Sequence, residues 1–156
     1  MRLKYIFVLI ILLASLALPS QANEASYAIS PKLLRDMLKT SDSHFNIANR
    51  NLISNDSIPF PAAIAFDAKG CFSGYFPSAD LGKLTFECIE GSDTLALSEI
   101  APDAAKQTEN SLVVMKLVPS FADGRCSQCE TIDAGIRHEL DAKGMDAKIF
   151  LADIAI

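Results

Sequence analysis

The sequence predicts an α/β fold built as one domain. Half of the 156 residues are hydrophobic, which suffices for one substantial buried core and excludes a fully disordered protein. Segments with the pattern of strands alternate along the chain with segments that have the periodicity of amphipathic helices. The length leaves little room for a second domain.

The amino terminus has the three parts of a secretory signal peptide. A positively charged start precedes an apolar run over residues 5–18, and small residues stand three and one positions before a cut after Ala22. The run of about 14 residues is shorter than the ~20 that a membrane-spanning helix needs. We therefore expect residues 1–22 to be removed and residues 23–156 to form a periplasmic or secreted domain.

The charge of the exported domain limits its partners. Removal of Arg2 and Lys4 takes the formal charge from −5 to −7. An acidic domain without a basic stripe is not expected to bind nucleic acid. No second long apolar run follows residue 22, so we expect no membrane-spanning segment after cleavage.

The first half of the exported domain predicts a helix and a β-hairpin. Ser30-Pro31 marks a helix start, because serine accepts hydrogen bonds from the first free amides and proline fits the first turn. Residues 41–57 are rich in Ser, Asn and Asp and are expected to form an irregular connection. Residues 62–66 and 71–76 have strand character and are joined by a turn at Gly70, which predicts the hairpin.

The second half predicts further strands and two helices. Lys83 to Glu90 alternates between apolar and polar residues, which favours a third strand, although Leu81, Leu84 and Cys88 would also share one face of a helix. The elements expected after it are a short strand over 94–97, a helix over 98–110, a buried strand over 112–118, a helix ending near Ala142 before Gly144, and a strand over 147–156.

The strongest chemical feature is Cys126-Ser127-Gln128-Cys129, which stands between a predicted strand and a predicted helix. At a helix start, free amides and the helix dipole would stabilise a Cys126 thiolate, and Arg125 would add to that effect. Cys129 follows one turn later, where it could attack a mixed disulfide at Cys126 and release the product. The pattern therefore predicts Cys126 as the nucleophile and Cys129 as the resolving cysteine.

The cysteines have other interpretations that stay open at this stage. The motif could be a purely structural disulfide, or all four cysteines could bind zinc, although zinc sites usually use two closely spaced pairs. An oxidising compartment favours disulfides, and of the three possible pairings we expect Cys71–Cys88 together with Cys126–Cys129. Cys71–Cys88 would then be a structural bridge. We expect no metal ion and no cofactor.

Two segments of the chain resemble the thioredoxin-like superfamily. Residues 112–118, the Cys-x-x-Cys motif, the helix after it and residues 148–154 look like that family's active-site strand, motif, helix and next strand. Residues 60–66 resemble the segment in which these proteins carry a cis-proline that faces the cysteines, followed by a hairpin. Pro61 would be that proline and would shape the substrate groove.

The resemblance implies a thiol–disulfide oxidoreductase, or redox partner, that exchanges disulfides with protein thiols or disulfides. The two halves stand in the reverse of the family's order, and a circularly permuted thioredoxin-like domain, with a central mixed sheet flanked by helices, would explain this. Lys116 stands where the family has a buried acid, so the protein is not expected to be a general reductant. The alternative is a non-enzymatic exported binding protein with two structural disulfides.

The signal peptide can be tested directly. Because the apolar run and the small residues before Asn23 form a cleavage site, the exported protein should begin at Asn23. Amino-terminal sequencing of the exported protein checks this. An intact Met1 terminus in the membrane fraction would show that the segment is an uncleaved anchor.

Overall fold

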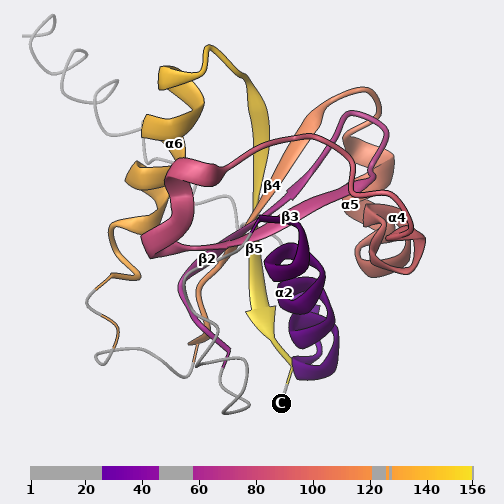
Figure 1. Cartoon of the computed structure of the whole chain (residues 1–156), viewed down its shortest axis with the longest axis horizontal. Coiled ribbons are helices and arrows are strands. Elements are labelled where there is room, and N and C mark those ends of the chain that lie inside the picture. The colour runs from indigo at the N-terminus through magenta and orange to yellow at the C-terminus, as the bar shows by residue number, and fades with distance from the viewer. Residues whose placement is uncertain (1–25, 46–57, 121–125, 127, 156) are drawn as a thin grey trace, which may run out of the picture.

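The computed structural model describes residues 26–45, 58–120, 126 and 128–155 (Figure 1). The expected signal peptide and Arg125 lie outside the described residues. In chain order the elements are β1 (Ser26–Ile29), α2 (Pro31–Phe45), β2 (Ala62–Phe66), β3 (Phe72–Pro77), the 3-10 helices η1 (Ser78–Lys83) and η2 (Asp93–Leu95), α4 (Leu97–Ile100), α5 (Pro102–Gln107), β4 (Leu112–Leu117), α6 (Ile132–Ala142) and β5 (Ala147–Ile154). The predicted α/β class is confirmed.

The strands form one mixed sheet in the order β1-β5-β4-β2-β3. β5 pairs in parallel with both β1 and β4, whereas β2 is antiparallel to both β4 and β3. The predicted hairpin, the buried strand before the Cys-x-x-Cys motif and the final strand are therefore confirmed. β1 was not expected, because four residues are too few for a strand pattern to stand out.

Helices cover both faces of the sheet. Side chains alternate along β2 and β4, so that Ile64 and Met115 pack on the face covered by α2, α4 and α5, while Ala65 and Val114 pack on the face covered by α6 and η1. Figure 1 shows α6 on one side of the sheet and α2, α4 and α5 on the other. Ala63 and Ala65 of β2 face α6, where Phe76 supplies the bulk that they lack, whereas Ala62 packs on the opposite face.

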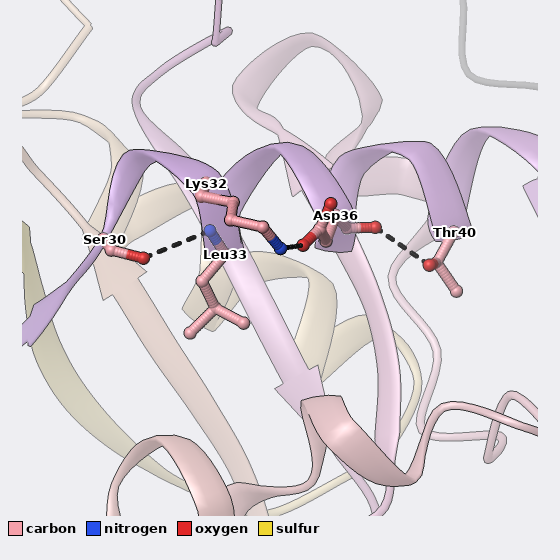
Figure 2. A network of polar contacts seen from close by, with 5 residues as sticks. All are labelled: Ser30, Lys32, Leu33, Asp36 and Thr40. Carbon is pink, nitrogen blue, oxygen red and sulfur yellow. Dashed lines mark hydrogen bonds and ion pairs between the residues drawn. The ribbon is translucent and has the colours of Figure 1, made fainter.

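The start of α2 is capped as its sequence predicts. The Ser30 hydroxyl oxygen accepts a hydrogen bond from the Leu33 amide at 3.2 Å, and Lys32 forms an ion pair with Asp36 one turn on (Figure 2). The Thr40 hydroxyl donates to the carbonyl of Asp36 at 2.8 Å. Such a hydroxyl is satisfied inside the helix, so threonine does not end it.

α2 continues to Phe45, so the expectation of an irregular connection from residue 41 is wrong at its start. The buried Ser41 hydroxyl donates to the Met37 carbonyl at 2.9 Å and accepts from the Tyr75 amide of β3 at 2.6 Å. β3 is an edge strand of the described sheet, and this contact satisfies an amide that has no strand partner. A tertiary hydrogen bond thus keeps a polar residue in the helix.

The third strand expected over Lys83–Glu90 is also wrong, because η1 ends at Lys83 and an irregular segment follows. Leu84 packs in the core under α6, while Ile89 packs in the core on the other face of the sheet. The Ile89 amide donates to the Phe72 carbonyl at 3.0 Å, and Cys88 is exposed. The alternation of apolar and polar residues over 83–90 therefore belongs to an irregular segment that passes from the core on one face of the sheet to the core on the other face.

The helical region near residue 100 differs from expectation in two ways. Residues 94–97 form the end of η2 and the start of α4, not a strand. The helix expected over 98–110 is divided into α4 and α5 at Ala101, whose φ is −147°. Ala101 precedes Pro102, and the residue before a proline is disfavoured in helical conformation.

The contact between α2 and β3 predicts a selective loss of stability. Ser41→Ala should lower the free energy of unfolding by about 1–3 kcal/mol, because it leaves the buried Tyr75 amide without an acceptor. The exposed Ser43, whose hydroxyl donates to Thr40 in the same helix, is the matched control, and Ser43→Ala should change stability by less than about 0.5 kcal/mol. Urea denaturation measures both, and equal effects would refute this role for Ser41.

Candidate functional site

The four cysteines form the two expected disulfides, Cys71–Cys88 and Cys126–Cys129. No described cysteine is free, so none offers the thiolate that a zinc site would need. Both cysteines of the second bridge are partly exposed. That bridge follows β4 and precedes α6, whereas the first joins the hairpin to the irregular segment after η1.

The Cys-x-x-Cys motif forms a turn of its own ahead of α6. The Cys129 amide donates to the Cys126 carbonyl at 3.2 Å, and the Thr131 amide donates to the Gln128 carbonyl at 3.2 Å. α6 begins only at Ile132, so the expectation that Cys126 stands at the helix start is wrong. Since the effect of a helix dipole fades within its first turn, it acts less strongly on Cys126 than the sequence suggested. Arg125, expected to add to it, lies outside the described residues.

Pro61 lies at the same end of the sheet as the motif. Ala62, the first residue of β2, pairs with Leu117, the last residue of β4. The peptide bond between Phe60 and Pro61 is cis, and Pro61 is buried. The register of β2 on β4 therefore brings the segment before β2 and the segment after β4 to one end of the sheet.

Ser78 links Pro61 to the motif. Its amide donates to the Pro61 carbonyl at 3.0 Å, and its hydroxyl donates to the Gln128 side-chain oxygen at 2.6 Å. Ser78 was not among the site residues predicted from the sequence. Its only signal was its position directly after the hairpin, where the chain returns to the end of β2.

A charged cluster connects β4 to α6. The Lys116 ammonium lies 3.1 Å from one carboxylate oxygen of Asp133, and Arg137 contacts the other oxygen at 2.8 Å. Hydrogen bonds from Arg137 and then Lys116 hold the pKa of Asp133 below its usual range, although partial burial opposes them. The spacing of Asp133 and Arg137, four residues apart, was the signal that could have revealed this pair.

A pocket of about 360 Å³ lies between η1 and α6. Ser78, Ala79 and Leu81 line it from η1, and Gln128, Thr131 and Gly135 line it from the motif and α6. Gln128, which lies between the two cysteines in sequence, is the residue of the motif that lines the pocket. Its lining contains no charged side chain.

The contacts around Cys71–Cys88 are those of a structural bridge at a hairpin turn. One carboxylate oxygen of Asp67 accepts from the Lys69 and Cys71 amides, each at 2.8 Å, and so shapes the hairpin turn. A carboxylate oxygen of Asp67 and the sulfurs of Cys71 and Cys88 lie within 4.8 Å of one another. Because the two sulfurs are bonded to each other, this proximity reflects the hairpin and its bridge.

No protein-family model, curated protein or solved structure matches this chain. Function has to be inferred from the chemistry of the site itself. Two formed disulfides fit a compartment outside the reducing cytosol. In the part of the chain that the structure describes, no helix has the length and apolar character to cross a bilayer.

The position of Cys71–Cys88 predicts a structural role. The bridge spans 17 positions of sequence, and replacing both cysteines with alanine should lower the free energy of unfolding by about 3 kcal/mol. The reactivity of Cys126 should stay largely unchanged, since this bridge joins other segments. Thermal unfolding and alkylation rates measure the two effects, and a large loss of Cys126 reactivity in the folded variant would contradict the separation of roles.

Proposed function

We propose that this chain is an exported protein of thiol–disulfide exchange, in which Cys126 is the nucleophile and Cys129 the resolving cysteine. The observation that carries the proposal is the setting of the Cys126–Cys129 disulfide. It is partly exposed and lies between a central strand and a helix, and Gln128, the residue before Cys129, lines a pocket. A partner's sulfur can approach such a bridge, which is what exchange requires.

The arrangement of strands supports the resemblance to a circularly permuted thioredoxin-like domain. The strand before the motif, β4, is central in the sheet, parallel to β5 after the motif and antiparallel to β2. β2 follows the cis peptide bond at Pro61 and forms the hairpin with β3. In this proposal Pro61 shapes the groove in which a substrate polypeptide lies, and Arg125 favours the Cys126 thiolate.

The exchange proceeds in two balanced steps when the protein is reduced. The Cys126 thiolate attacks one sulfur of a partner's disulfide, the partner's S–S bond breaks, and its other sulfur leaves as a thiolate. The Cys129 thiolate then attacks the Cys126 sulfur, forms the Cys126–Cys129 bond and releases the partner's second thiolate. The partner gains two electrons, and the protein loses two. In the reverse direction the protein's disulfide oxidises a pair of partner thiols.

Trapping of the mixed disulfide tests the proposal. Cys129→Ser removes the second step, so this variant should accumulate mixed disulfides through Cys126 when it reacts with oxidised glutathione or with a protein substrate that contains disulfides. Cys126→Ser is the matched control and should accumulate few, because the proposal assigns the first attack to Cys126 and only the second to Cys129. Mass spectrometry of acid-quenched samples identifies the linked cysteine.

Two results would contradict the proposal. If Cys129 alkylates faster than Cys126 at neutral pH, the roles are assigned wrongly. If neither thiol reacts without denaturant, the disulfide is structural and the chain is the exported binding protein that the sequence left as the alternative.

A further inference from the structure

From the pocket between η1 and α6 we infer a specificity site that rests on the proposed function. We propose that this pocket receives an uncharged aliphatic side chain of the partner polypeptide, from a residue one or two positions away from the cysteine that joins Cys126. The site would make the exchange selective for cysteines that have such a neighbour.

The chemistry of the walls selects the kind of side chain. The apolar part is made by Leu81 and Ile132, which are 8% and 1% exposed. The polar part is neutral and is partly occupied, because the Ser78 hydroxyl already bonds to the Gln128 side chain. A charged side chain would lose water and find no counter-charge in the lining, whereas an aliphatic one would gain apolar contact.

The place of the pocket sets which partner residue it can reach. Gln128 is a wall of the pocket and also the residue directly before Cys129. An extended chain advances about 3.3–3.6 Å per residue, so the neighbours of a cysteine bonded to Cys126 remain close to the motif. The pocket volume of about 360 Å³ has room for one side chain of this kind.

Gly135 keeps one wall of the pocket open. A β-carbon at this position would lie 2.9 Å from the Leu81 Cδ1 atom, closer than two carbons can approach. Gly135→Ala would therefore push Leu81 from its place beside α6. Ala79 is exposed at the rim, and Ala79→Leu would fill the pocket from η1 without adding bulk to a buried position.

Rates of exchange with short peptides test the inference. The protein is the exported chain with Cys129→Ser and an intact Cys71–Cys88 bridge. The probes are peptides with one cysteine in disulfide with thionitrobenzoate, identical except for Leu, Ala or Lys next to the cysteine. Cys126 attacks the peptide sulfur and thionitrobenzoate leaves, which gives a coloured readout. Each rate is divided by that of the same peptide with reduced glutathione.

The leucine peptide should react about tenfold faster than the alanine peptide, and the lysine peptide should show no gain over alanine. The lysine peptide is the stricter comparison for the leucine peptide, because the negatively charged domain attracts lysine and would by itself raise the rate of the lysine peptide. Ala79→Leu and Gly135→Ala should remove most of the preference for leucine. Gly82→Ala is the matched control and should keep it, because nothing lies within 4 Å of a β-carbon there.

The outcomes separate the two proposals. Equal corrected rates for all three peptides, with Cys126 reactive, would overturn the specificity site and leave the exchange function standing. A leucine preference that survives both pocket variants would place the specificity elsewhere and also overturn the inference. If Cys126 of the folded protein reacts with none of the peptides, both the exchange function and the specificity site are overturned.

Discussion

The antiparallel pairing of β2 with β4 joins the two halves of the chain and brings Pro61 to the end of the sheet at which β4 ends. All five residues of β2 are buried, and the strand bonds to β3 on one side and β4 on the other. A shift of one residue in this register would exchange the alanines that face α6 with Ile64 and Phe66. The core on each face therefore holds the register, and the register places Pro61 at the end of the sheet where the Cys-x-x-Cys motif begins.

The two disulfides act on the chain at different ranges. Cys71–Cys88 closes a loop of about 18 residues and holds to the hairpin a segment that forms no regular structure, so it contributes about 3 kcal/mol. Cys126–Cys129 spans only three positions and restricts the unfolded chain less, so its own contribution to stability is about 2 kcal/mol. The fold depends less on the second bridge, which leaves it more free to open and close. When the second bridge is open, the hydrogen bond of Ser78 to Gln128 and the ion pair of Lys116 with Asp133 still hold the motif to η1 and β4 to α6.

The sequence predicted those elements whose signals are local. The cap at Ser30, the hairpin, the buried strand before the motif and the end of α6 near Gly144 follow from turn residues and periodicity, and the structure contains each of them. Predictions failed where tertiary contacts decide. Ser41 stays helical because β3 supplies an amide, and the segment after Lys83 alternates because its two apolar ends enter different cores. In the site, the cysteine pairs were predictable from compartment and spacing, and the Asp133–Arg137 pair from its spacing of four residues. The contacts of Ser78 with Gln128 and of Asp133 with Lys116 depend on the pairing of distant segments.

Reduction potentials distinguish a Cys126–Cys129 bridge that exchanges from a Cys71–Cys88 bridge that is structural. The exported protein is equilibrated in a series of glutathione buffers, its thiols are trapped, and mass spectrometry assigns the oxidised fraction of each pair. We expect Cys126–Cys129 to be reduced at a potential between about −120 and −270 mV, as in exchange proteins, and Cys71–Cys88 to resist reduction to below about −300 mV. A value below about −300 mV for Cys126–Cys129 would refute the exchange function and assign both bridges to structure.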